Sequence, residues 1–287
     1  MALMLGGAAA PDPFLLSDSV ATSAGLTGGT MGYRTTSGRS PRAVTINPAQ
    51  KTLIYLSFGQ SLRSNILPTL VSPANPSVIH NFNIYDGNFY DVAGPLLGTT
   101  YASSLSPPLG PGNPLVLEAD KFIVAGFDQV VLCSGCIGGT TAAQWGDPGG
   151  PHADRGPKMI RRLAARGITP ATPGTIWLCE FAIGNQDLAI GTSQAAFMAS
   201  AANFTNNMTA AGFNGRFFIP LESGAGQTSN AIRSAQAALV DNINIFSNGD
   251  FDSSAIATSD SVHPNNAGGA TQATISYNAK HASGTPY

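Results

Sequence analysis

Charge is the scarcest property of this sequence. Charged residues make up 10% of its 287 residues, far below the roughly 25% of an average soluble domain. The formal net charge of −2 provides neither the basic surface that binds nucleic acid nor a polybasic patch for a membrane. No uninterrupted apolar run approaches the roughly 20 residues that cross a bilayer. We therefore expect no nucleic-acid partner and no membrane span.

Cysteine is also scarce, with three residues. An odd number cannot pair completely within one chain, so the count does not describe a disulfide framework. Cys133 and Cys136 form a CxxC spacing, but no second pair and no nearby histidine completes a zinc site. We expect buried, structurally neutral cysteines, with a local disulfide as the alternative. The opening MALMLGGAAAPDP lacks the basic leading region of a signal peptide, so localisation stays undetermined, with export or surface association as the alternative.

Apolar residues are plentiful, at 43% of the chain, which is enough for a packed core. Residues 1–50 are rich in Gly, Ser, Thr, Ala and Pro without a sustained period, which indicates an irregular N-terminal extension. Residues 51–287 read as one domain in which strand-like and helix-like segments alternate. The expected strands are 52–57, 128–134, 175–184, 216–223 and, more weakly, 243–250. The expected helices are 114–126, 158–166, 193–212, 231–240 and 265–281.

This alternation predicts parallel strands joined by crossover helices on both faces of the sheet. The segment 78–92 adds a hairpin, because Asp86-Gly87 separates two β-rich runs. We expect a three-layer α/β/α sandwich of the flavodoxin-like type with a central parallel sheet. In such folds the ligand crevice lies outside the carboxyl ends of the strands.

Four polar blocks follow the predicted strands or precede the last helix. Gly59-Gln60-Ser61 follows the first strand, and Gly138-Gly139-Thr140-Thr141 follows the next core strand. Gly184-Asn185-Gln186-Asp187 follows the third, and Asp260-Ser261-Val262-His263-Pro264-Asn265 precedes the terminal helix. The fold would therefore bring a serine, glycine amides, side-chain amides and an acid–histidine pair to one edge of the sheet.

These residue types suit acyl transfer. A serine hydroxyl needs an adjacent base to become a nucleophile, and a histidine oriented by a carboxylate is such a base. Backbone and side-chain amides stabilise the oxyanion that forms on the acyl carbonyl. Each block also has a simpler interpretation taken alone: a helix N-cap at Ser61, an ordinary Gly-Gly turn, a cap at Asn185 to Asp187, and Asx-turn chemistry in DSVHPN. Their joint placement at successive strand ends favours catalysis.

The four blocks resemble those of the SGNH (GDSL-type) hydrolases, and more narrowly the branch of carbohydrate acetylesterases that includes sialate O-acetylesterases. That branch carries GQSN, GGT followed by Trp, a W…QGExD block and DxxHP. Here the counterparts are GQSL (59–62), GGTTAAQW (138–145), Trp177 to Asp187 and DSVHPN (260–265). The blocks span residue 53 to about residue 267, so the N-terminal extension has no counterpart.

The resemblance implies a role for each matching residue. Ser61 would be the nucleophile, His263 the base and Asp260 its orienting carboxylate. The amides of Ser61 and Gly139 would form part of the oxyanion hole, completed by Asn185 or Gln186, because IGNQD departs from both QGExD and the wider GxND pattern. The resemblance also places Gln60 and Trp145 at the substrate. No cofactor or metal is implied.

The sequence therefore predicts a serine esterase of small acyl esters, acetyl on a carbohydrate being the expected substrate. One alternative is a weakly active or inactive carbohydrate-binding or structural module on the same fold, which the altered IGNQD block favours. Another is an esterase of lipid or aryl esters, suggested by the apolar Leu62 and Ile66 beside the serine. Oligomeric state is not determined by the sequence.

Overall fold

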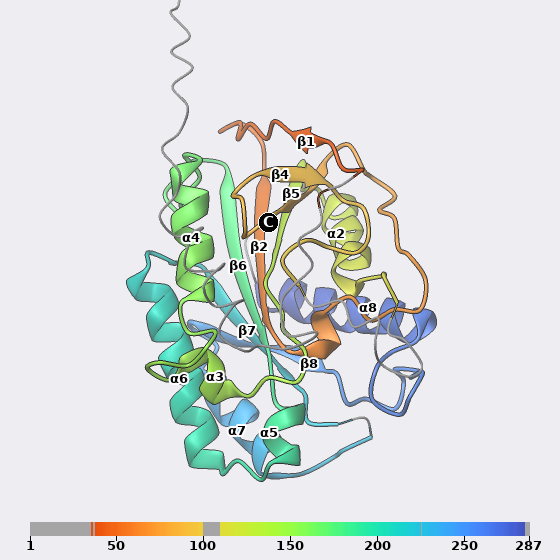
Figure 1. The fold of residues 1–287 in the computed structure, drawn as a ribbon, viewed down its shortest axis with the longest axis vertical. Coiled ribbons are helices and arrows are strands. Elements are labelled where there is room, and N and C mark those ends of the chain that lie inside the picture. Colours follow the sequence, from red (N-terminus) through yellow and green to blue (C-terminus); the bar gives the residue numbers. More distant parts are fainter. Residues whose placement is uncertain (1–35, 37, 100–109, 225, 285–287) are drawn as a thin grey trace, which may run out of the picture.

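The structure, a computed structural model, describes residues 36, 38–99, 110–224 and 226–284. It is an α/β/α sandwich whose sheet runs through the middle with helices on both faces (Figure 1). The sheet has the strand order β1-β4-β3-β5-β2-β6-β7-β8. Its strands are β1 (Pro41–Arg42), β2 (Thr52–Gly59), β3 (Ile79–Phe82), β4 (Phe89–Asp91), β5 (Gln129–Ser134), β6 (Thr175–Ala182), β7 (Arg216–Leu221) and β8 (Ile245–Asp250).

The helices form the two outer layers. One layer holds α2 (Pro114–Val124) and α8 (Asn266–Ala282), and the other holds α4 (Arg155–Ala165), α6 (Gln194–Ala210) and α7 (Ala231–Leu239) (Figure 1). Two short helices that the sequence did not predict, α3 (Ala142–Gly146) and α5 (Asn185–Ala189), follow β5 and β6. A 3-10 turn, η1 (Ser61–Arg63), follows β2. The predicted α/β/α fold class is confirmed.

The strands from β3 through β5, β2, β6 and β7 to β8 pair in parallel, as predicted. The predicted hairpin is also present, because β3 and β4 pair antiparallel with His80 opposite Asp91. In the N-terminal segment, β1 adds an antiparallel edge strand to β4. Residues 1–35 and 37 lie outside the described residues, so the domain boundary near residue 50 stays a prediction.

The central strand β2 is buried along its whole length, as expected of a strand covered on both faces. Successive side chains alternate between the two cores, since a strand points them to opposite faces. Leu53 and Tyr55 pack with α2, whereas Ile54 and Leu56 pack with α4 and α6. The sheet is therefore held from both sides at the strand that leads to Ser61.

An apolar stripe of α6 faces the core. Phe197, Ala201, Phe204 and Met208 are buried, and their 4-3-4 spacing places them on one side of the helix. Ser193 caps the N-terminus by accepting the amide of Ala196 at 3.2 Å. The sequence periodicity was sufficient here because the helix is long and amphipathic.

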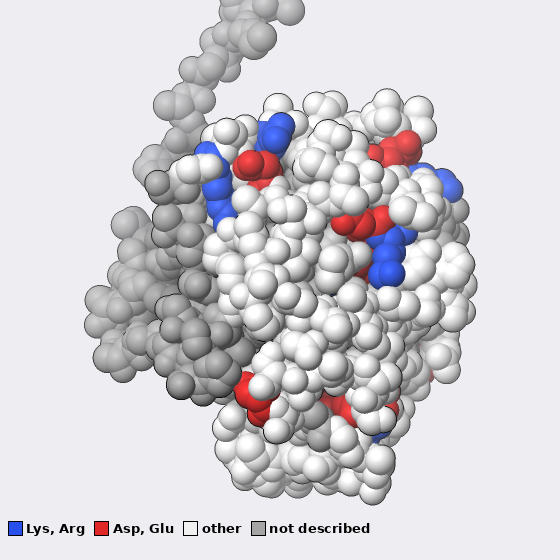
Figure 2. All heavy atoms as spheres, turned by 90° about the vertical axis from the view of Figure 1, so that its right-hand side faces the viewer, with Lys and Arg blue, Asp and Glu red and all other residues white. Residues whose placement is uncertain are grey.

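The low charge of the sequence is visible on the surface, where few charged side chains interrupt the face shown in Figure 2. None of the described helices is long and apolar enough to span a membrane. Cys133, Cys136 and Cys179 are buried and form no disulfide, so the alternative of a local disulfide is not realised. Burial raises the pKa of the Cys133 thiol above its usual range, which makes it a poor nucleophile.

Candidate active site

The segment that carries Ser61 begins at the carboxyl ends of β2 and β6. Gly59, the last residue of β2, has a φ of 120°, and a Cβ there would collide with the carbonyl of Ala182 on β6. Only glycine permits this close approach. The next residue, Gln60, donates its backbone N–H to the same Ala182 carbonyl at 2.8 Å. The chain therefore stays attached to β6 until it turns outward at Ser61.

Ser61, His263 and Asp260 form a continuous hydrogen-bonded chain. His263 Nε2 lies 3.0 Å from Ser61 Oγ, and His263 Nδ1 lies 2.7 Å from Asp260 Oδ2. Ser61 opens η1 after β2, whereas the other two residues come from the loop before α8, about 200 residues later in the chain. A base within hydrogen-bond reach of a serine, itself oriented by a carboxylate, is the geometry of a catalytic triad.

The loop that carries Asp260 and His263 is a tight turn held by hydrogen bonds from its backbone to the Asp260 side chain. Asp260 Oδ1 accepts the N–H groups of Val262 at 3.0 Å and His263 at 2.7 Å. Ser261 between them has a φ of 68°, a left-handed conformation uncommon for serine. Burial acts to raise the pKa of Asp260, but the hydrogen bonds from the His263 ring and backbone outweigh it, and the pKa is lowered. Asp260 is therefore ionised at neutral pH and oriented towards the imidazole.

Two backbone amides at this edge have no acceptor among the described residues. Neither the Ser61 N–H nor the Gly139 N–H donates a hydrogen bond to any described residue. Gly139 is exposed, with a φ of 71°, and a Cβ built on it would meet nothing within 4 Å. Both amides can therefore donate to a bound group, as an oxyanion hole requires.

The structure distinguishes the two side-chain amides of the GNQD block, Asn185 and Gln186, by their hydrogen bonds. Asn185 Nδ2 donates to the backbone carbonyl of Ser223 at 3.4 Å. The side chain of Gln186 makes no hydrogen bond within the described part of the chain, while its backbone N–H donates to Gln60 Oε1 at 3.3 Å. The side-chain amide of Gln186 is therefore more available to donate to a bound group than that of Asn185.

Asp187 ties two of the predicted blocks together. Its buried Oδ2 accepts the N–H of Ala142, the first residue of α3, at 3.0 Å. Because Ala142 follows the GGTT segment, this bond fixes the loop carrying Gly139 to the start of α5. Burial raises the pKa of Asp187 to about 6 despite the hydrogen bonds that oppose the rise.

Comparisons with solved structures bear on the fold. A protein from Arabidopsis thaliana superposes with a TM-score of 0.57 at 15% identity, over 82% of this chain and 99% of the other. The protein NanS gives 0.51 at 12% identity, over 82% and 97%. A member of the G-D-S-L lipolytic family from Veillonella parvula gives 0.44 at 11% identity, over 82% of this chain and all of that one (100%). The chain shares its fold with the Arabidopsis protein and with NanS.

No protein-family model matches the sequence, and no curated protein matches it significantly. The likeness is therefore one of fold, as identities of this size indicate. The structure brings Ser61, His263 and Asp260 into hydrogen-bond contact, and their catalytic roles stay a prediction.

Two predicted substrate contacts are not supported by the structure. Gln60 is 1% exposed, and its side chain points inward to Glu222 and the Gln186 backbone. Trp145 is completely buried, packed between Phe58 and Phe204, with its indole N–H donated to Thr140 Oγ1 at 2.8 Å. Both residues support the loops of the site from beneath instead of contacting the substrate.

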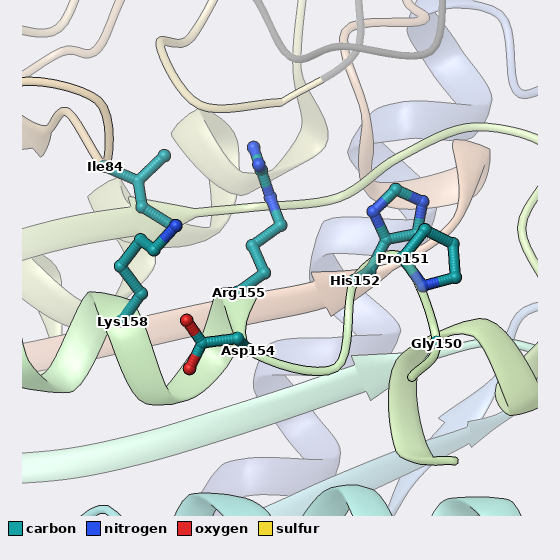
Figure 3. A pocket seen from close by; sticks show the side chains of 7 residues that line it. All are labelled: Ile84, Gly150, Pro151, His152, Asp154, Arg155 and Lys158. Atoms are coloured by element: carbon teal, nitrogen blue, oxygen red, sulfur yellow. The ribbon is translucent and has the colours of Figure 1, made fainter. Parts of the chain in front are cut away.

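His152 lies beside a separate pocket of about 110 Å³ (Figure 3). Its ring packs against Trp145 with 5.0 Å between the ring centroids and a tilt of 39° between the planes. Burial lowers the pKa of His152 to about 4, with Arg155 adding to the effect. Arg155, which also lines the pocket, donates to the carbonyls of Gly135 and Gly98. Ser61, Asp260 and His263 are not among the residues that line this pocket.

The structure also places charged residues beneath Ser61 that the motifs did not identify. Arg63 and Lys280 meet Glu118 and Glu180 in a cluster of completely buried ion pairs. An acidic residue within the otherwise apolar strand 175–184 was the one sequence signal, and Glu180 is a buried, hydrogen-bonded carboxylate. Burial acts to raise its pKa, but Arg63 and Lys280 hold it well below its usual range. The cluster is balanced in charge, as buried ions require.

Proposed function

We propose that this protein is a serine esterase that hydrolyses small acyl esters through an acyl-enzyme. The observation that carries the proposal is the chain of contacts from Ser61 Oγ through the His263 ring to Asp260, with distances of 3.0 and 2.7 Å. A module that only binds has no need for a serine aligned on an oriented histidine at a strand end.

The reaction follows from this geometry. His263 Nε2 takes the proton of Ser61 Oγ as the oxygen attacks the acyl carbonyl, and Asp260 stabilises the imidazolium. The tetrahedral intermediate collapses when His263 returns the proton to the leaving alcohol oxygen. Water then attacks the acyl-serine by the same proton transfers and releases the carboxylic acid. Ser61 and His263 carry the proton transfers in these steps, and Asp260 orients His263.

The developing oxyanion would be bound by the N–H groups of Ser61 and Gly139, both of which lack an acceptor in the described structure. We assign the third donor to the side-chain amide of Gln186, because that of Asn185 is directed to the Ser223 carbonyl. A preorganised donor of this kind contributes about 3–4 kcal/mol to lowering the barrier.

A short acyl group, such as acetyl, suits this site better than a long one. Leu62 and Ile66, the apolar neighbours that would favour lipid or aryl esters, are 3% and 1% exposed and belong to the core. They offer no apolar surface to an acyl chain. The exposed edge instead carries the partly exposed amide side chains of Asn185 and Gln186, which favour a substrate rich in hydroxyl groups. We therefore propose acetyl esters of carbohydrates as the substrate class.

The test compares hydrolysis of p-nitrophenyl acetate and p-nitrophenyl butyrate by the wild type, Ser61→Ala and His263→Ala. We expect turnover in the wild type, with acetate preferred, and its loss in both variants without a change in melting temperature. A folded wild type with no turnover above the variants would overturn the esterase proposal and favour a carbohydrate-binding module, to be examined by glycan binding. Acetylated sugars are the next substrates.

A further inference from the structure

Glu222 is a buried carboxyl next to the site that belongs to none of the four sequence blocks. It directly follows β7 and is 0% exposed. Its Oε1 accepts the Nε2 hydrogen of Gln60, the residue before the nucleophile. Its Oε2 has no hydrogen-bond partner, and no ion pair to Glu222 exists within the described residues. An ionised carboxylate would be very unfavourable in this position.

Gln60 connects Glu222 to the backbone of Gln186. The amide of Gln60 uses both ends, because Nε2 donates to Glu222 and Oε1 accepts the backbone N–H of Gln186 at 3.3 Å. A glutamine amide has distinct donor and acceptor ends. An acceptor at position 222 therefore fixes the orientation in which the oxygen faces Gln186. The opposite orientation would set the NH2 group against another N–H donor.

The charged groups facing Glu222 do not favour its ionisation. Glu180 on β6 and Asp252 after β8 are both carboxylates, and Arg63 on η1 is the cation near it. Arg63 is already paired with Glu180 and Glu118, and Asp252 is paired with Arg233. Burial, reinforced by these carboxylates, raises the pKa of Glu222 to about 8 although the Gln60 hydrogen bond opposes the rise. Its surroundings thus favour the neutral form of Glu222.

We propose that Glu222 is a positioning residue whose ionisation switches the esterase off. In its neutral form, Glu222 holds the side chain of Gln60, and through it the backbone of Gln186, in place beside Ser61. The proposal rests on the proposed function. A negative charge one side chain away from the nucleophile would oppose the negative charge that develops on the acyl oxygen. It would also draw the carboxylate towards water, since a buried anion without a partner cation is unstable.

The experiment measures kcat and KM for p-nitrophenyl acetate from pH 5 to pH 10 in the wild type, Glu222→Gln and Glu222→Leu, with the rate of Ser61→Ala subtracted. We expect Glu222→Leu to lower kcat by about 10- to 100-fold with KM changed less than about twofold, because the amide of Gln60 loses its acceptor. Glu222→Gln keeps an oxygen acceptor and should recover kcat to within about threefold of the wild type at pH 7.

The pH profile separates positioning from mere stability. In the wild type, kcat should fall about tenfold per pH unit above about pH 8, whereas Glu222→Gln, which cannot ionise, should lack this fall. Met208→Ala, a core truncation in α6, is the control that lowers the melting temperature without changing the pH profile.

Three results would overturn the proposal. An alkaline fall that persists in Glu222→Gln, or a kcat of Glu222→Leu equal to that of the wild type, contradicts it while leaving the esterase assignment intact. Should Glu222→Leu fail to fold, the pH profile of Glu222→Gln decides alone. Absence of Ser61-dependent turnover in the wild type would instead remove the proposed function, and this proposal with it.

Discussion

The guanidinium of Arg63, two residues after Ser61, is paired with the carboxylate of Glu180 in the middle of the protein, and both side chains are completely buried. Lys280 Nζ of α8 contacts the same carboxylate at 2.9 Å. Because α8 begins three residues after His263, one carboxylate of β6 anchors both the turn that carries Ser61 and the helix that follows His263. The two segments that form the candidate triad therefore share one support.

Removing the charge of Arg63 should be strongly destabilising. In Arg63→Met, Lys280 would be the one partner cation left to Glu118 and Glu180 among the described residues. A buried charge left uncompensated costs about 3–5 kcal/mol. We expect a loss of that size in the free energy of unfolding, measured by chemical denaturation. Asp154→Asn is the control, because it removes an ion pair with Arg161 in which the carboxylate is 60% exposed, and should change stability by less than about 1 kcal/mol. Equal effects of the two substitutions would contradict this account.

Asp187→Asn should stabilise the protein at neutral pH. The folded-state pKa of Asp187 is raised by burial to about 6, so the unfolded chain loses this proton at lower pH than the folded chain does. The carboxyl therefore disfavours folding increasingly as pH rises from about 4 to about 6, and the penalty stays constant above that. Asn keeps an oxygen acceptor for the Ala142 N–H but cannot ionise. We expect equal stability near pH 3.5 and up to about 3 kcal/mol in favour of the variant at pH 7.

Urea unfolding at the two pH values measures this difference. A variant less stable than the wild type at pH 7 would show that the ionised form of Asp187 is favourable in the folded protein.

Asp260→Asn should lower kcat by about 10³- to 10⁴-fold, because an amide cannot stabilise the imidazolium and permits the wrong tautomer of His263. The side chain of Asp260 is 26% exposed, so the fold should tolerate the change. Steady-state kinetics with p-nitrophenyl acetate gives kcat, and circular dichroism reports the fold. A decrease below tenfold would indicate that another acceptor orients His263.

The two amides of the GNQD block can be told apart by matched truncations. Gln186→Ala should lower kcat by about 10²- to 10³-fold with little change in KM, as expected when one oxyanion donor is lost. Asn185→Ala, the matched control from the next position, should lower kcat less than about tenfold, because its amide already binds the Ser223 carbonyl. The reverse order of effects would assign the oxyanion role to Asn185.

The strands and helices of the core were predictable because their signal is local. The buried run of β2, the hairpin turn at Asp86-Gly87 and the stripe of α6 all depend on neighbours within a few turns or strand residues. The short helices α3 and α5 were missed, since five residues carry too little periodicity to distinguish a helix from a loop. The capping box that starts α3 at Thr141 was the available signal.

The candidate triad was also predictable, because SGNH-type blocks at successive strand ends place Ser61, Asp260 and His263 on one edge of a parallel sheet. The solvent exposure of each matching residue could not be predicted from the sequence. Gln60 and Trp145 stand in the right blocks, yet both side chains turn into the protein, and a motif does not specify which face of a loop a side chain occupies.

The sequence alone thus determined the order of elements, the carboxyl edge on which the site lies and the residue types available there, since these follow from local pattern and parallel topology. Only the tertiary structure decided what lies beneath the site. The hydrogen-bond partners of Arg63, Asp187 and Glu222 come from segments that are distant in the sequence, up to 213 residues away. These distant segments also set the pKa values of the buried carboxyl groups. Burial and charge pairing are properties of the assembled core, so they appear only once the distant segments have packed together.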